Sequence, residues 1–224
     1  MPVIYIIGDS TAENGSAPFF GWGGQLQALC RQEVTVCNFA KGGESSRSFF
    51  ERGLFEFVRR EIGPQDLLLA QFGHNDEKED PERHTDPWSS FPAYMRRYAD
   101  TALKAGAMAA LLTPVSRRYF LPDGNLLYTH GEYPLAVRSL AARCGLPCID
   151  LESLSRRMYL KLGQEASAEL FVRIPKGENK QYPEGLEDLT HFCLEGARRI
   201  AAFVGASMAR EPRLAGFIRN GAFT

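Results

Sequence analysis

Residues 3–11 read Val3-Ile4-Tyr5-Ile6-Ile7-Gly8-Asp9-Ser10-Thr11, an apolar run that ends in a glycine and a polar turn. A short, uninterrupted apolar run bounded by a turn is typical of a strand that is buried on both faces of a parallel sheet. Two further runs of this kind follow at Val34–Asn38 and Leu67–Phe72, and each also ends in a polar or glycine-rich turn. We therefore expect three buried strands whose carboxyl ends carry these turns.

Segments with the helical spacing of apolar residues alternate with these strands and with two shorter strand-like runs, Ala107–Leu112 and Pro147–Asp150. The expected helices are Trp22–Arg31, Phe49–Arg60, Phe91–Lys104, Tyr133–Arg143, Leu151–Leu162 and Gly196–Ala209. Alternating strands and helices form right-handed crossovers and a parallel sheet that is covered on both faces. The sequence therefore predicts an α/β fold, a three-layer α/β/α sandwich with a central parallel sheet of about five strands, in one domain over residues 1–224.

One connection is too long and too polar for this pattern. The stretch Glu77–Ser90 follows the third strand and contains Pro81 and Pro87. Long loops in compact domains are usually either functional or disordered. We therefore ask whether this loop closes over a binding site, which the sequence leaves open.

Composition and charge exclude several classes of protein. Lys and Arg number 26 and Asp and Glu number 27, so the net charge is −1 and no basic field favours nucleic acid or an anionic membrane surface. No apolar stretch approaches the roughly 20 residues that span a bilayer. We see no secretory signal, and we expect a cytoplasmic protein. The five cysteines have no C-x-x-C spacing, so we expect reduced thiols rather than a zinc site or a redox centre.

Polar residues that suit catalysis follow the first three expected strands. Because the carboxyl ends of parallel strands meet at one edge of a sheet, Ser10, Gly43 and Asn75 are expected to lie close together. A fourth polar cluster, with Asp188 and His191, precedes the last expected helix. Each piece alone also fits a structural role, as a helix cap, a tight turn or a surface charge. A metal site built with His74 and His191 lacks the usual ligand spacing, and we expect none.

Taken in order, these pieces resemble a known family. The blocks Gly8-Asp9-Ser10, Gly43, Gly73-x-Asn75-Asp76 and Asp188-x-x-His191 resemble the four-block pattern of the SGNH (GDSL-like) hydrolases. Beyond these blocks, the residues of five segments are similar to those of rhamnogalacturonan acetylesterases. These segments are residues 8–12, 43–49, 71–76, 113–118 and 188–192. The resemblance runs from about residue 3 to about residue 205, and it implies a flavodoxin-like hydrolase fold.

The resemblance also implies a role for each residue of the blocks. Ser10 is the expected nucleophile, His191 the base that takes its proton, and Asp188 the carboxylate that orients the imidazole, since a serine hydroxyl is a poor nucleophile without a base. The backbone N–H groups of Ser10 and Gly43 and the side-chain amide of Asn75 are the expected oxyanion hole, where donors stabilise the charge of the tetrahedral intermediate.

Substrate-binding residues are less sharply indicated. Relatives of this kind often carry arginine where this chain has Glu44, a carboxylate that would repel an acidic sugar unless Arg47 neutralises it. Arg117 and Arg118 are candidates for binding an acidic sugar, although all four charges also fit a solvated surface. His74 either contacts the sugar or packs beside Asn75.

The expected activity is removal of acetyl groups from an oligosaccharide, with a pectin-derived rhamnogalacturonan fragment as the expected substrate, without a cofactor. The alternatives are a xylan acetylesterase, a hydrolase of small acyl esters or thioesters, and a non-catalytic sugar-binding module. The sequence does not indicate an oligomeric state.

Overall fold

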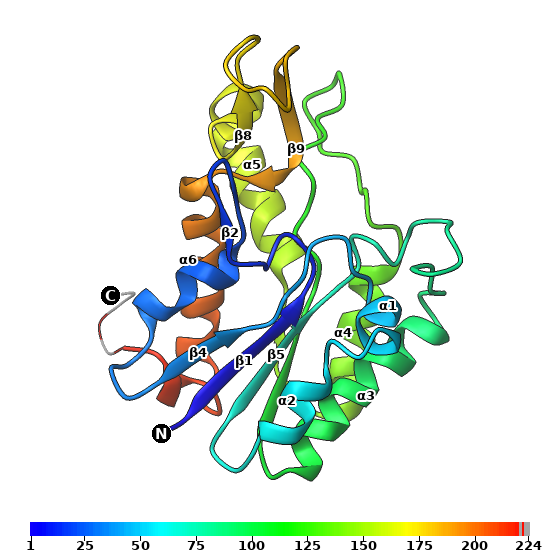
Figure 1. Cartoon of the computed structure of the whole chain (residues 1–224), viewed down its shortest axis with the longest axis vertical. Coiled ribbons are helices and arrows are strands. Elements are labelled where there is room, and N and C mark those ends of the chain that lie inside the picture. The colour runs from blue at the N-terminus through cyan, green and yellow to red at the C-terminus, as the bar shows by residue number, and fades with distance from the viewer. Residues whose placement is uncertain (220, 222–224) are drawn as a thin grey trace.

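The computed structural model describes residues 1–219 and 221, and a five-stranded parallel sheet lies at its centre (Figure 1). Its strands are β1 (Val3–Gly8), β4 (Thr35–Asn38), β5 (Leu67–Gln71), β6 (Met108–Leu112) and β7 (Cys148–Ile149). They lie in the order β4-β1-β5-β6-β7, and every pairing is parallel. The predicted parallel sheet is thus confirmed.

Helices cover both faces of this sheet. One face packs against η1 (Trp22–Leu29), α5 (Leu151–Ala168) and α6 (Leu194–Arg210), and the short η2 (Ala215–Phe217) closes the same core. The other face packs against α1 (Ser46–Glu51), α2 (Glu56–Glu61), α3 (Ser90–Lys104) and α4 (Tyr133–Cys144). Alternate residues of β1 supply the two cores, because side chains along a strand point to opposite faces. The predicted three-layer sandwich is therefore confirmed.

A second, antiparallel sheet stands beyond the carboxyl end of β1, in the upper part of Figure 1. It consists of β2 (Gly15–Ser16), β3 (Phe19–Phe20), β9 (Leu186–Phe192) and β8 (Phe171–Ile174), in that order. The sequence pattern does not predict this sheet. Two of its strands have only two residues each, which is too short for any periodicity to show.

The helices also differ from the prediction in three places. The expected helix Phe49–Arg60 is two helices, because Gly53 has φ +74° between α1 and α2. The segment η1 is a 3-10 helix, and it contains Gly23 and Gly24. The helix α5 continues past Leu162 to Ala168, with a break at Gly163. Across the described part of the chain, no helix is both long and apolar enough to cross a membrane.

Candidate active site

Ser10 lies on the turn that follows β1, and its neighbour Asp9 holds that turn. The buried Asp9 carboxylate accepts hydrogen bonds from the backbone N–H of Thr11 at 3.0 Å and from the Thr11 hydroxyl at 2.7 Å. Burial raises the pKa of Asp9, and the hydrogen bonds from Thr11 act against that rise. At Gly8 an added Cβ atom would lie 2.6 Å from the backbone oxygen of Gln71, so a side chain there would push β1 and β5 apart. The turn that carries Ser10 is therefore held by the hydrogen bonds of Asp9 and by the close packing of Gly8 against β5.

Ser10, His191 and Asp188 form one chain of hydrogen bonds. The Ser10 Oγ lies 3.1 Å from Nε2 of His191, and Nδ1 of His191 lies 2.8 Å from Oδ2 of Asp188. Asp188 and His191 belong to β9 rather than to a loop, and α6 begins after Cys193, so neither residue caps that helix. The structure thus brings together three residues that are as many as 181 positions apart.

An irregularity within β9 explains how residues three apart can meet. Glu187 pairs with Arg173 and Phe192 with Phe171, so residues 188–191 have no one-to-one partners on β8. In a regular strand, side chains at positions i and i+3 point to opposite faces. The extra residues bend the strand locally, as in a β-bulge, and turn Asp188 back toward His191.

The Asp188 carboxylate is held in its charged form. Burial raises its pKa, but the hydrogen bonds from the His191 side chain and from the backbone N–H groups of His191 and Thr190 outweigh burial, and the net pKa lies below its ordinary value. The two backbone N–H groups donate to Oδ1 at 2.8 and 2.6 Å. Because an ionised carboxylate only accepts hydrogen bonds, the neutral form of the His191 imidazole carries its proton on Nδ1, and in that form the lone pair of Nε2 faces Ser10.

The two remaining blocks meet beside each other. Gly43 has φ +82°, a backbone conformation that favours glycine, although a Cβ atom there would meet nothing within 4 Å. The Asn75 Nδ2 donates to the backbone oxygen of Glu44 at 2.9 Å. The amide group has two N–H donors, so this bond leaves the second one for another acceptor.

Asp76 anchors the turn that carries Asn75. Its buried carboxylate accepts the backbone N–H of Ser46 at 3.0 Å, the Ser46 hydroxyl at 2.5 Å and the Thr85 hydroxyl at 3.0 Å. Burial raises the pKa of Asp76 to about 7, against the hydrogen bonds from Ser46 and Thr85. These contacts connect the turn after β5 to the start of α1 and to the long loop, residues 77–90, that follows this turn.

Glu44 is not a solvated surface charge. Its side chain is buried, accepts a hydrogen bond from the Ser48 hydroxyl at 2.5 Å and pairs with Arg52 at 2.9 Å. The expected partner Arg47 instead pairs with Glu51 one helical turn further on, at 3.1 Å. Arg52 therefore neutralises Glu44, and Arg47 does not.

His74 lies beneath the surface rather than in a position open to a sugar. It is 3% exposed, and its ring contacts the ring of His130, with the two centroids 4.3 Å apart. Burial, together with repulsion from His130 and Arg117, holds the pKa of His74 well below its ordinary value. The structure thus packs the ring of His74 against His130.

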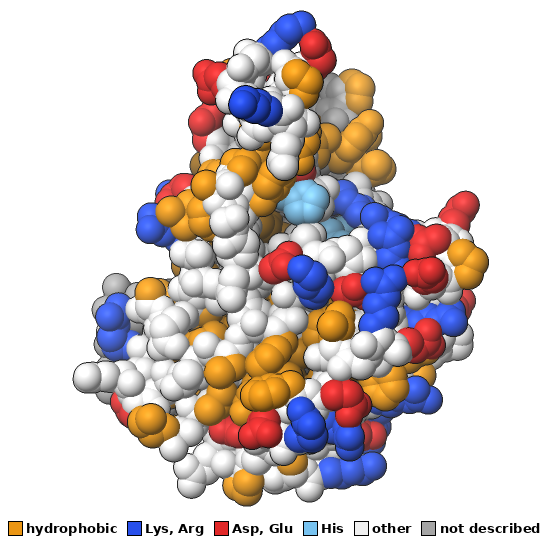
Figure 2. Space-filling model, viewed as in Figure 1, with side chains coloured by type: hydrophobic (Ala, Val, Ile, Leu, Met, Phe, Trp, Pro, Cys, Tyr) orange, Lys and Arg blue, Asp and Glu red, His pale blue; other side chains and the backbone are white. Residues whose placement is uncertain are grey.

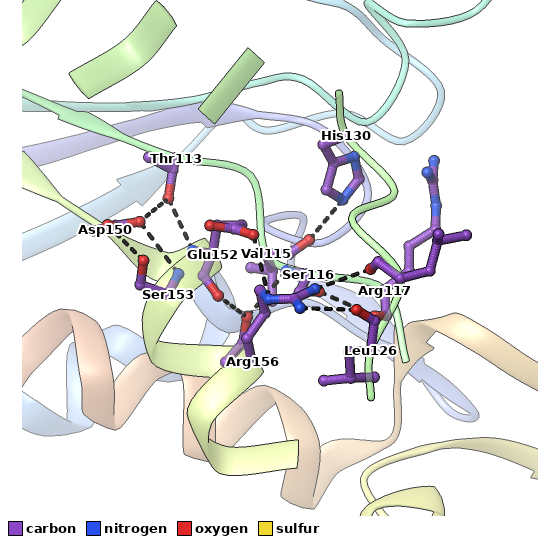
Figure 3. Close-up of polar contacts among 12 residues, drawn as sticks. Thr113, Val115, Ser116, Arg117, Leu126, His130, Asp150, Glu152, Ser153 and Arg156 are labelled. Carbon is purple, nitrogen blue, oxygen red and sulfur yellow. Dashed lines mark hydrogen bonds and ion pairs between the residues drawn. The ribbon is translucent and has the colours of Figure 1, made fainter. Parts of the chain in front are cut away.

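Arg117 is committed to contacts within the protein. It pairs with Glu77 at 2.5 Å and donates to the backbone oxygen of His74 at 3.2 Å. Figure 3 shows the segment after β6 that carries Arg117, with Thr113 bound to Asp150 and the backbone of Val115 bound to His130. The arginine thus ties this segment to the turn that carries Asn75.

Arg118 faces a different hollow from the one beside Ser10. It donates to the backbone oxygen of Gln164 at 3.0 Å, and burial lowers its pKa. Gln164, Glu187 and Asp188 also line this hollow. Of the described residues that line the hollow beside Ser10, none is Arg117 or Arg118. Neither arginine therefore lines the hollow beside Ser10, whereas Arg118 lines a second hollow that borders Asp188.

Three residues that surround Ser10 and His191 were not predicted from the sequence. A hollow of about 300 Å³ beside these two residues is also lined by Glu13, Phe19 and Tyr182. Phe19 belongs to β3, and Tyr182 lies between β8 and β9, so the unpredicted sheet brings them here. Only Glu13 could have been expected there from the sequence, because it follows Ser10 by three residues and so must lie near it.

The thiols and potential metal ligands show no assembled centre. Cys30, Cys37, Cys144, Cys148 and Cys193 are free. Over residues 1–219 and 221, no three His, Cys, Asp or Glu side chains are grouped so that they could hold a metal ion.

Comparison with known proteins places the chain in a family. The model of the GDSL-like lipase/acylhydrolase family matches residues 6–199. The chain is 40% identical over 204 residues to the rhamnogalacturonan acetylesterase RhgT of Bacillus subtilis, a match that covers 90% of this chain and 87% of that protein. It is 34% identical, also over 204 residues, to the probable rhamnogalacturonan acetylesterase YesY of the same organism, with 90% and 89% covered.

Solved structures agree with the sequence comparison. The crystal structure of the YxiM protein of Bacillus subtilis superposes with a TM-score of 0.81 at 27% identity, over 96% of this chain and 58% of that one. The chain thus spans little more than half the length of that protein. The acetyl xylan esterase AlAXEase superposes with a TM-score of 0.65 at 17% identity, over 92% of this chain and 98% of that one, which shows a shared fold. The chain is therefore an esterase of the GDSL-like lipase/acylhydrolase family.

Proposed function

We propose that this protein removes O-acetyl groups from oligosaccharides, with Ser10 as the nucleophile. The Ser10 Oγ bonds to the acetyl carbonyl carbon while Nε2 of His191 takes the hydroxyl proton. The bond from that carbon to the sugar oxygen then breaks, and His191 gives the proton to the departing oxygen. A water molecule next adds to the acetyl-serine, passing its proton through His191 back to Ser10 as acetate leaves. Water is the only co-reactant, so the reaction needs no cofactor.

The observation that carries this proposal is the chain of hydrogen bonds from Ser10 through His191 to Asp188, at 3.1 and 2.8 Å. A base that is aligned by a charged carboxylate and bonded to a hydroxyl is the arrangement that activates a serine. A non-catalytic sugar-binding module has no use for it. The names of the relatives RhgT and YesY support acetyl as the acyl group and a rhamnogalacturonan fragment as the substrate.

Acetate release from a panel of acetylated substrates tests this function. The panel contains pectic rhamnogalacturonan oligosaccharides, xylan oligosaccharides and an acetyl thioester, and the Ser10→Ala protein serves as the blank. We expect acetate release above the blank, fastest from the pectic substrates. A faster reaction with xylan oligosaccharides or with the thioester would contradict the proposed pectic substrate and would favour the corresponding alternative. No release above the blank from any substrate would contradict the esterase mechanism.

The Asn75 side chain provides a prediction about the oxyanion hole. With its second N–H aimed at the developing oxyanion, Asn75→Ala should lower kcat by about two orders of magnitude. KM should change little, because this bond strengthens only as charge develops on the oxygen. Asn75→Asp should be worse, since it places a carboxylate both beside the backbone oxygen of Glu44 and where negative charge must form.

The two Asn75 variants also separate this role from that of a turn former. Aspartate tolerates the same backbone geometry as asparagine, so a turn-forming role makes Asn75→Asp the milder change. Measuring kcat and the melting temperature of both variants distinguishes the two. An Asn75→Asp protein more active than Asn75→Ala would contradict the oxyanion role.

A further inference from the structure

The hollow beside Ser10 and His191 has an apolar wall of aromatic rings. We name it the aromatic pocket and define it by Ser10, Glu13, Phe19, Tyr182 and His191. The rings of Phe19 and Tyr182 lie with centroids 6.1 Å apart, and Phe19 meets the ring of His191 edge-on at 5.8 Å. All three rings are partly exposed. Figure 2 shows a histidine at a depression of the surface, with hydrophobic side chains gathered on one side of it.

The aromatic pocket lies on the side of Ser10 where the leaving sugar oxygen must receive its proton. In the proposed reaction, Nε2 of His191 must give a proton to the departing sugar oxygen. The sugar ring that bears the ester therefore lies on the His191 side of Ser10, and the aromatic pocket is lined by these two residues and by the rings next to them. One face of a sugar ring carries C–H groups, and burying that face against aromatic rings is favourable.

Glu13 supplies a polar group inside the same pocket. Its Oε2 accepts the backbone N–H of Gly42 at 2.9 Å, and its Oε1 lies 3.3 Å from Nζ of Lys41. The side chain is 32% exposed, so these contacts hold it in place without closing it off. A carboxylate only accepts hydrogen bonds, and a sugar hydroxyl is a suitable donor for it. The pocket thus offers an apolar wall, which matches the C–H face of a sugar ring, and a hydrogen-bond acceptor, which matches its hydroxyl groups.

We infer that the aromatic pocket is the site for the sugar ring that carries the ester, with its C–H face against Phe19 and Tyr182 and a free hydroxyl bound to Glu13. This inference rests on the proposed function, since it uses the direction of proton transfer by His191. It assigns the preference for sugar esters over simple esters to Tyr182, Phe19 and Glu13. The carboxylate of a uronic residue bound here points away from Glu13, because two like charges repel.

Kinetics with two esters tests the inference. Tyr182→Ala is compared with Tyr182→Phe and with the control Tyr128→Ala, an exposed tyrosine on the loop after β6 that is stacked by Arg156. One substrate is a monoacetylated methyl glycoside and the other is ethyl acetate, whose leaving group has neither a sugar nor an aromatic ring. We expect Tyr182→Ala to raise KM for the glycoside about tenfold, a typical effect of one aromatic contact, and to lower its kcat/KM at least about five times more than that for ethyl acetate. Tyr182→Phe should retain most of the preference, and Tyr128→Ala all of it.

Glu13→Gln tests the polar side of the pocket. The glutamine keeps an oxygen for the N–H of Gly42 but loses the charge, so we expect a loss of about fivefold in kcat/KM that is confined to glycosides with a free hydroxyl beside the ester. Equal losses on both substrates, or none in Tyr182→Ala, would overturn the inference.

A binding measurement separates failure of the pocket from failure of the proposed function. In the Ser10→Ala background, calorimetry with the acetylated glycoside should show binding that Tyr182→Ala weakens about tenfold. Equal binding by both proteins would overturn the pocket. The absence of hydrolysis of any ester by the wild-type protein would instead overturn the esterase mechanism.

Discussion

Replacing Ser10 with alanine should lower kcat for acetyl-ester hydrolysis by at least about 10⁴-fold while the protein stays folded. The reason is that no other hydroxyl takes its place at 3.1 Å from Nε2 of His191 among the described residues. The hydroxyl is on a turn rather than in a core, and alanine keeps the Cβ atom, so its loss removes the nucleophile and little packing. Turnover with an acetyl ester and thermal melting of both proteins measure the two effects.

The double variant with His191→Ala gives a sharper version of this test. Residues that act as one catalytic unit are strongly non-additive, so adding His191→Ala to Ser10→Ala should change the remaining rate by less than about threefold. Ser16→Ala, an exposed serine on β2, is the matched control and should retain wild-type turnover. A Ser10→Ala protein with wild-type kcat would show that another group performs the attack.

The main sheet was predictable because its strands are buried on both faces. Such strands consist of continuous apolar residues, as in β1 and β5, and the pattern survives without knowledge of any neighbour. The small sheet was not predictable for the opposite reason. Its strands β2 and β3 have two residues each, and β9 contains an irregularity at residues 188–191 that breaks any alternation. These strands depend on tertiary pairing rather than on local preference.

The candidate site divides along the same line. Ser10, Gly43 and Asn75 follow predicted strands, so the topology alone brings them together. Partners that depend on side-chain reach were missed. Glu44 is neutralised by Arg52, eight residues on, because α1 directs Arg47 toward Glu51 instead.

The pairing of Arg117 was missed for a related reason. It needs a carboxylate from the long loop after β5, and Glu77 provides it at 2.5 Å. The local sequence of the loop after β5 predicts neither its path nor this contact, and the local sequence around Arg117 does not predict the contact either. Interactions of this kind become visible only once two connections are placed side by side.

Asp188→Asn should lower kcat by about 10⁴-fold, although asparagine has almost the same shape as aspartate. The Oδ1 of Asp188 accepts two backbone N–H groups, from Thr190 at 2.6 Å and from His191 at 2.8 Å. An asparagine must keep its oxygen at that position, which turns its NH₂ group toward Nδ1 of His191. Two donors cannot face each other, so the imidazole proton moves to Nε2. Nε2 then points a proton at Ser10 and can no longer accept one.

Asp188→Ala separates this tautomer effect from simple loss of structure. Alanine leaves the same two backbone N–H groups without their acceptor, at a cost of about 1–3 kcal/mol each if they stay dry, which corresponds to several degrees of melting temperature. It also leaves the imidazole free to adopt either tautomer. We therefore expect the two variants to rank in opposite orders, with Asp188→Asn the more stable protein and the one with the lower kcat. Nitrogen-15 spectra of His191 would report the proton on Nε2 in Asp188→Asn and on Nδ1 in the wild type. An Asp188→Asn protein that is more active than Asp188→Ala would contradict this account, because Asp188 would then matter only for holding the irregular part of β9 in place.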